Sequence, residues 1–265
     1  MATYFQVRIA GEERTYAAQA AQAALDLLDK LESQLSRFRP SSDIAQLAQL
    51  APGGTLRLSE PAFACLEIAR KMEAATQGAF SATAAALQSQ SAPPQWSLLA
   101  GEQSIRCDSG RLEFDLGAIG KGFALDRMGE LLQSWECPSF LLVAGGSSIL
   151  AGDAPADSGG WSCGLGDDNA PQRFLLAHAS LSGSGLAVKG SHIFDPRTGR
   201  AAARQSRAWA LTDTAAESDA LSTASMVLSE QELVEVMALN EQWLVFLDTG
   251  TTAQPIGKRP LPPHA

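Results

Sequence analysis

The segment FDLGAIGKGFALDRM, residues 114–128, combines a carboxylate, a flexible turn and a cation within a few positions. Its glycines, which let the backbone approach a ligand or adopt a positive φ angle, are Gly117, Gly120 and Gly122. Lys121 lies where a helix is expected to begin, and free N–H groups at a helix N-terminus attract anions. Asp115 could accept hydrogen bonds from a ligand or assist a metal. The segment is therefore consistent with an anion-binding site. It is also consistent with a strand-to-helix turn that carries a surface lysine.

A second set of polar side chains lies in ESDALSTAS, residues 217–225. Asp219 and Thr223 are four residues apart, so they share one face of a helix, and Ser222 is adjacent. Carboxylate and hydroxyl oxygens are hard ligands that suit Mg²⁺ or Ca²⁺. The alternative is that Asp219 or Ser218 simply caps the helix.

The segment GSHIFDPRTGR, residues 190–200, contains a rigid turn directly after a histidine. In Asp-Pro-x-Thr-Gly the Asp can bond its own backbone, Pro sets φ and Gly permits the turn. His192 is the best candidate for proton transfer near neutral pH, although a structural imidazole is the alternative. Of the other histidines, His178 is expected in the core and His264 in a disordered tail.

Two further segments place glycine and serine after an apolar run. They are VAGGSSILAGD at 143–153 and LSGSG at 181–185. Backbone N–H groups in such turns can cradle a polar ligand. Both segments could equally be hairpin connections.

The elements that must position these residues can be read from periodicity and caps. Apolar spacing predicts helices over 17–36, 60–76, 121–135, 217–229 and 231–239, the second of them opened by Ser59. A further short helix is expected within 38–50, with Ser41 or Ser42 as its N-cap. Strands are expected at 4–9, 111–116, 139–144, 161–166, 173–184, 207–213 and 241–248, with a weak strand near 103–108 in an otherwise irregular 88–110.

This order predicts an α+β fold, with a mainly antiparallel sheet, flanking helices and a helical N-terminal third. It is not the alternation of a dinucleotide-binding βαβ fold. No linker divides the chain, so we expect one domain over residues 1–250, followed by a Pro-rich, extended tail over 251–265.

Composition excludes several classes of function. The net charge is −9, so binding to nucleic acid is not expected, because phosphate contacts dominate such binding. No apolar run is long enough to span a membrane. The four cysteines form no CxxC pair, which argues against a zinc site and a disulfide framework. The first residues lack the pattern of a signal peptide, so we expect a cytoplasmic protein.

Taken in order, these segments resemble the ApbE family, the FAD:protein FMN transferases. The resemblance begins at MATYFQV, continues through LSRFRPSSDIAQL, GAF and DLGAIGKGFALD, and ends with AGGSSILAG, SHIFDPRTG and SDALSTA. It implies an enzyme that binds FAD and Mg²⁺, cleaves the pyrophosphate and transfers FMN to a Thr or Ser hydroxyl of an acceptor protein. Alternatives are an Mg²⁺-dependent FAD pyrophosphatase that releases FMN and AMP, or a non-catalytic FAD-binding protein.

The resemblance also implies roles for individual residues. His192 would be the general base and Asp219 a catalytic metal ligand. The other metal ligands would be Thr223, the carbonyl of Ala118 and the adjacent Ser222. Contacts to FAD would come from Met1, Phe38, Ala79, Phe80, Ser81, Asp115, Lys121 and Phe194.

The chain departs from the family pattern at several positions. Ala48 stands where the family usually has Asn, and Ser81 stands where Asp is common. Ala2 replaces Gly, and Ser147 follows the double glycine where Asn or Asp is usual. These departures leave the expected metal and phosphate residues intact, and they alter the expected flavin and adenine surroundings.

Overall fold

The computed structural model describes residues 3–88, 92–165, 172–185, 194–201, 205–250 and 252–265. Its centre is a seven-stranded sheet in which every neighbouring pair of strands is antiparallel. In spatial order the strands are β1 (Phe5–Ile9), β5 (Phe140–Ala144), β6 (Ser148–Ala151), β9 (Ala179–Gly185), β12 (Arg207–Thr212), β13 (Leu244–Asp248) and β14 (Ala253–Gly257). The predicted α+β fold with a mainly antiparallel sheet is confirmed.

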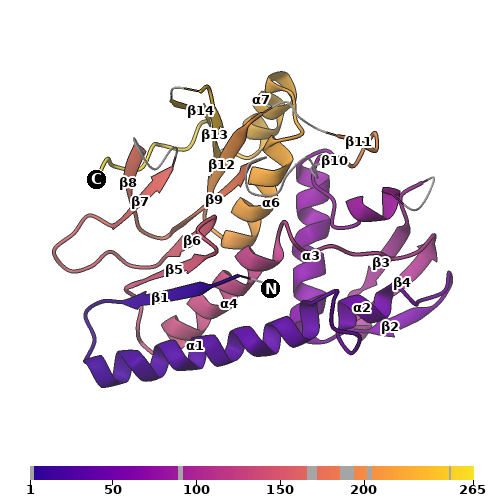
Figure 1. Cartoon of the computed structure of the whole chain (residues 1–265), viewed down its shortest axis with the longest axis horizontal. Coiled ribbons are helices and arrows are strands. Elements are labelled where there is room, and N and C mark those ends of the chain that lie inside the picture. Colours follow the sequence, from indigo (N-terminus) through magenta and orange to yellow (C-terminus); the bar gives the residue numbers. More distant parts are fainter. Residues whose placement is uncertain (1–2, 89–91, 166–171, 186–193, 202–204, 251) are drawn as a thin grey trace.

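Two helices, α4 (Gly120–Ser134) and α6 (Ala215–Ser225), pack on one face of this sheet (Figure 1). The apolar stripe of α4 is buried, with Phe123, Met128 and Leu132 almost fully covered. Helix α6 is built mainly from Ala and Ser. Small side chains let a helix lie close to its neighbours, so α6 is enclosed by α4, α3 and the sheet.

The helical N-terminal third lies along and beside this layer (Figure 1). It consists of α1 (Arg14–Leu35), α2 (Asp43–Leu47) and α3 (Glu60–Ala75). The predicted caps are confirmed: the Ser42 and Ser59 side chains accept backbone N–H groups at the starts of α2 and α3. Gly78, with φ of 78°, ends the turn after α3. Helix α1 begins earlier than expected because Glu13 caps it.

Smaller elements complete the fold. A three-stranded sheet contains β2 (Thr55–Arg57), β4 (Ser104–Ser109) and β3 (Gln95–Leu99). The pair β7 (Trp161–Leu165) and β8 (Gln172–Leu176) packs on the face of the main sheet away from α4 and α6. The remaining elements are the hairpin β10 (Phe194–Asp195) and β11 (Arg200–Ala201), helix α7 (Glu230–Leu239), and the 3-10 turns η1 (Ala84–Gln88) and η2 (Ala100–Glu102).

The predicted strand over 111–116 is wrong. Leu112, Phe114 and Leu116 do alternate into the core, as the pattern indicated. Within the described part of the chain, however, this segment belongs to no β ladder. Its Asp115 N–H instead donates to the carbonyl of Ala82 at 2.7 Å. Alternation indicates which side chains are buried, but it does not show whether a segment pairs with another strand.

Other local predictions also need correction. Residues 88–110 hold two strands, β3 and β4, where one weak strand was expected. Residues 173–184 form two strands rather than one, and His178 lies between them with φ of 50° and a side chain that is 72% exposed, so it is not a core residue. His264 stacks on Phe174 with ring centroids 5.1 Å apart rather than lying in a disordered tail. In the Pro-rich C-terminal segment, β14 pairs with β13 in the main sheet.

Candidate active site

The centre of the site is an ion pair between the first turn of α4 and the middle of α6. The Nζ atom of Lys121 lies 2.8 Å and 3.1 Å from the two carboxylate oxygens of Asp219. The lysine side chain is 16% exposed and the aspartate side chain 2%. Lys121 is therefore not a surface lysine. Asp219 does not cap its helix either, because it lies in the fifth position of α6 and faces α4.

Two features of α4, a glycine and a carboxylate, allow it to lie this close to α6. A Cβ atom on Gly122 would lie 1.9 Å from the carbonyl oxygen of Ala215, so only glycine fits there. The carboxylate of Asp126, one turn further along α4, accepts the N–H groups of Ala215 and Ala216 at 2.6 Å and 2.8 Å. Asp126 thus supplies the N-terminal cap of α6 from a neighbouring helix. Burial raises the pKa of Asp126 to about 7, although both N–H groups favour its charged form.

Hydroxyl groups surround Asp219 on the sheet side. Ser148 of β6 donates to its Oδ1 at 3.3 Å. Ser222 and Thr223 donate to the Asp219 carbonyl. The Ser184 hydroxyl of β9 lies 3.0 Å from Oγ of Ser222 and 3.1 Å from Oγ1 of Thr223. These hydroxyls are mostly buried, and the hydrogen bonds among them hold their oxygen atoms in place.

The donor set around Asp219 fits Mg²⁺. No group of three His, Cys, Asp or Glu side chains converges anywhere in the described residues. Mg²⁺ does not need such a cage, because it is usually held by one or two carboxylates together with substrate phosphates and water. Asp219 and Thr223 offer one carboxylate and one hydroxyl at helical spacing. Ala118, partly buried just before α4, could add its carbonyl.

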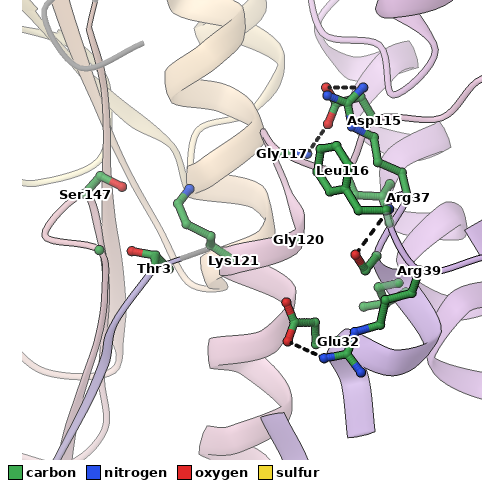
Figure 2. A pocket seen from close by; sticks show the side chains of 14 residues that line it. Thr3, Glu32, Arg37, Arg39, Asp115, Leu116, Gly117, Gly120, Lys121 and Ser147 are labelled. Atoms are coloured by element: carbon green, nitrogen blue, oxygen red, sulfur yellow. Dashed lines mark hydrogen bonds and ion pairs between the residues drawn. The ribbon is translucent and has the colours of Figure 1, made fainter. Parts of the chain in front are cut away.

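A cavity of about 600 Å³ opens beside this ion pair. The α4 turn and the β5–β6 connection form its inner wall, which contains Gly117, Gly120, Lys121, Gly145 and Ser147. The segment after α1 forms the outer wall, and Figure 2 shows Arg37 and Arg39 there, across from Lys121. Thr3, near the N-terminus, also reaches the cavity.

The outer wall carries its own ion pair and an exposed ring. Arg37 lies 3.4 Å from Asp115, with the two side chains 45% and 40% exposed. The guanidinium of Arg37 also lies over the Phe38 ring, 4.7 Å from its centroid, and Phe38 is 80% exposed. Asp115 is fixed further by the N–H of Gly117 at 2.9 Å. This wall can present a planar ring and a guanidinium to a ligand.

The hairpin of β10 and β11 is anchored to α7 by one arginine. Arg197 bonds Asp195 at 2.9 Å and Glu232 at 2.7 Å, and Glu232 also forms a capping box with Ser229. The N–H and hydroxyl of Ser229, together with Arg197, lower the pKa of Glu232 to about 2. The same arginine side chain packs 3.4 Å from the Cβ position of Gly78. The hairpin, which carries Phe194, therefore lies next to the turn that leads into Ala79.

The sequence model of the ApbE family matches residues 1–246. The chain belongs to the ApbE family. A protein of Salmonella typhimurium named FAD:protein FMN transferase is 26% identical over 152 residues, which are 52% of this chain and 43% of that protein. One from Klebsiella pneumoniae is 23% identical over 151 residues, 52% of this chain and 43% of the relative. The matched part of the chain spans less than half of these curated relatives.

Solved ApbE structures share the fold across nearly the whole chain. The flavin transferase ApbE of Vibrio cholerae superposes with a TM-score of 0.81 at 19% identity, covering 97% of this chain and 95% of that one. The apo form of the Pseudomonas stutzeri flavinyl transferase ApbE gives 0.79 at 19% identity, with 95% and 90% covered. The expected ApbE-like fold is therefore confirmed.

The structure brings together some of the residues expected from the ApbE resemblance. Lys121, Asp115 and Phe38 line the cavity, and Asp219 meets Lys121 behind it. Ala79 and Phe80 are core residues, 1% and 2% exposed, and do not line it. Ser81, partly buried, bonds Thr83 instead. Met1 and His192 lie outside the described residues.

Sequence reasoning missed several residues of the site. Ser148 and Ser184 contact the Asp219 region, and their segments had been noted only as glycine–serine stretches. Arg37 and Arg39 flank Phe38 in the LSRFRP segment but were not singled out, and Glu32 lines the cavity without a local motif. Of the departures from the ApbE pattern, Ser147 does line the cavity, whereas Ala48 ends α2 and accepts a bond from Arg111 at 3.0 Å.

Proposed function

We propose that this chain transfers FMN from FAD to a Thr or Ser hydroxyl of an acceptor protein, in a reaction that requires Mg²⁺. The observation that carries the proposal is the Lys121–Asp219 pair on the inner wall of a cavity of about 600 Å³, within an ApbE fold. A lysine at the N-terminus of a helix that begins in a glycine-rich turn is well placed to bind a pyrophosphate. The names of the curated relatives support the same activity.

The residues of this chain would bind and orient FAD. Lys121 and the N-terminal turn of α4 would neutralise the pyrophosphate, while Arg37 and Phe38 would contact a ring system at the outer wall. Mg²⁺ would be held by Asp219, Thr223, the Ala118 carbonyl and the neighbouring Ser222. Bound there, the ion would stabilise negative charge on the phosphate oxygens.

Transfer requires a base for the acceptor hydroxyl. The acceptor oxygen would bond to the phosphorus of the FMN half, the bridging P–O bond would break, and AMP would leave with that electron pair. The hydroxyl proton would pass to His192, which stays a prediction from the sequence. Arg197 would support this step by fixing the hairpin that follows His192.

The test is FAD turnover with and without Mg²⁺, in the presence of an acceptor domain that carries a Thr/Ser flavinylation motif. We expect the intact mass of the acceptor to increase by one FMN only when Mg²⁺ is present. Asp219→Ala should reduce the rate at least about a hundredfold. Asp213→Ala is the matched control, because Asp213 is 64% exposed and pairs with Arg259 outside the cavity.

Other outcomes identify the alternatives. Release of FMN and AMP with an unmodified acceptor would indicate an FAD pyrophosphatase. Stable FAD binding with neither release nor transfer would indicate a flavin-binding protein. Either result would contradict the proposed transferase.

A further inference from the structure

The carboxylate of Asp219 has its acceptor sites filled. Its Oδ1 accepts from Lys121 at 2.8 Å and from Ser148 at 3.3 Å. Its Oδ2 accepts from Lys121 at 3.1 Å and from the N–H of Gly122 at 3.2 Å. A carboxylate offers about four lone-pair positions. A cation that coordinates Asp219 must therefore displace one of these donors.

The three groups that donate to the Asp219 carboxylate differ in how easily they can move away from it. The Gly122 N–H belongs to the backbone of α4, which packs so closely on α6 that a Cβ on Gly122 would lie 1.9 Å from the Ala215 carbonyl oxygen. Ser148 is fully buried in the paired strand β6. Lys121 alone of the three has a long flexible side chain, and its positive charge is repelled by an incoming cation. Lys121 is therefore the donor that an incoming cation displaces from Asp219.

We propose that Lys121 is an exchangeable counter-ion for Asp219, and that a divalent cation, by displacing it, releases its ammonium group to a bound pyrophosphate. This inference rests on the proposed function and concerns the order in which the same site is filled. Lys121 thus has two alternative partners, a carboxylate of the protein and a phosphate of the ligand.

Charge balance supports the exchange. Lys121 and Asp219 together are neutral while they are paired. Replacing the ammonium by a dication at Asp219 leaves two net positive charges at the inner wall, which match the two negative charges of a dinucleotide pyrophosphate. The other cations of the cavity already have acidic partners on the outer wall: Arg37 pairs with Asp115, and Arg39 pairs with Glu32 at 3.0 Å. The released Lys121 is therefore the cation best suited to the phosphates.

The exchange has consequences that a simple phosphate-binding lysine would not produce. Removing Lys121 should make cation binding tighter in the absence of nucleotide, because a competitor has been removed. Removing the charge of Asp219 should make FAD binding tighter in the absence of metal, because Lys121 is then no longer paired with a carboxylate of the protein. Coupling through direct contact between metal and phosphate predicts neither gain.

The experiment measures two binding equilibria with the full chain and no acceptor. Mn²⁺ binding without nucleotide is followed by the EPR signal of free Mn²⁺, and FAD binding without metal is followed by flavin fluorescence in EDTA. We expect Lys121→Met to bind Mn²⁺ roughly tenfold more tightly than wild type. We expect Asp219→Asn to bind FAD roughly tenfold more tightly than wild type without metal.

Arg39→Met is the matched control, because it also removes one positive charge from the cavity wall. Its Mn²⁺ affinity should stay within about twofold of wild type, since long-range repulsion across solvent is screened. Unchanged or weaker Mn²⁺ binding by a folded Lys121→Met protein would overturn the exchange. If that variant does not fold, the Asp219→Asn measurement decides, and FAD binding no tighter than wild type would overturn the exchange. Wild-type protein that binds neither Mn²⁺ nor FAD would instead contradict the proposed function.

Discussion

The cavity is bounded by two ion pairs of the same chemistry in different surroundings. On the inner wall, Lys121 and Asp219 are 16% and 2% exposed and are held between two packed helices. On the outer wall, Arg37 and Asp115 are 45% and 40% exposed, at the end of α1 and in an irregular segment. Burial strengthens the first pair and makes the loss of either partner costly, whereas solvent screens the second. The inner wall is therefore preorganised, and the outer wall can adapt to a ligand.

The largest difference should appear at the glycines next to the two ion pairs, Gly122 beside Lys121 and Gly117 beside Asp115. Gly122→Ala would place a Cβ 1.9 Å from the Ala215 carbonyl, so α4 and α6 would have to separate. We expect the free energy of unfolding to fall by about 3 kcal/mol or more. Urea denaturation measures this change.

Gly117→Ala is the corresponding change beside the exposed ion pair, because the Gly117 N–H donates to Asp115. Its Cβ would lie 3.0 Å from Oδ1 of Asp115, a partly exposed side-chain atom that can rotate away. The expected loss is below about 1 kcal/mol. Equal losses for the two variants would show that the contact between α4 and α6 is no more rigid than the segment around Asp115.

The ion pairs themselves provide the second comparison. Lys121→Met leaves a buried carboxylate without its cation, and we expect a loss of about 3 kcal/mol in the free energy of unfolding. Arg37→Met should cost less than about 1 kcal/mol. Measured at 1 M NaCl, the smaller effect should shrink further while the larger one persists. Similar effects of salt on both variants would contradict the difference in burial.

The last comparison concerns pH and the helix contact behind the inner wall. Folded Asp126 keeps its proton up to a pKa of about 7, whereas its ordinary value is 3.8. Between these values the folded state binds more protons than the unfolded state, so this group makes stability fall as pH rises. The slope is at most about 1.4 kcal/mol per pH unit.

Asp126→Asn should remove that slope between about pH 4.5 and 7. Urea denaturation across this range, compared with wild type, measures the difference. Asp213→Asn, which changes an exposed carboxylate, should keep the wild-type slope. A wild-type stability that rises steadily over this range would show that the buried carboxylate does not govern it.

Much of the fold could be predicted from local signals. The caps at Ser42 and Ser59 and the apolar stripe of α4 are patterns within one turn or one helix, and the structure confirms them. The failures share a cause. Residues 111–116 alternate like a strand, and the segment after His178 reads as part of a continuous strand. Strand pairing and strand ends depend on partners far away in the sequence, which local alternation does not contain.

The same difference between local and long-range information applies to the site. By itself, the sequence determined the glycine turn with Lys121, the helical spacing of Asp219 and Thr223, and the order of motifs that places the chain in the ApbE family. Only the tertiary structure decided that Lys121 meets Asp219 across 98 positions of the chain, and that Asp126 caps a helix 89 positions away. It also decided that Phe80 is a core residue and that Arg37 lines the cavity. The physical reason is that spacing fixes which side chains share a face of one element, whereas the packing of α4, α6 and the sheet fixes which faces meet.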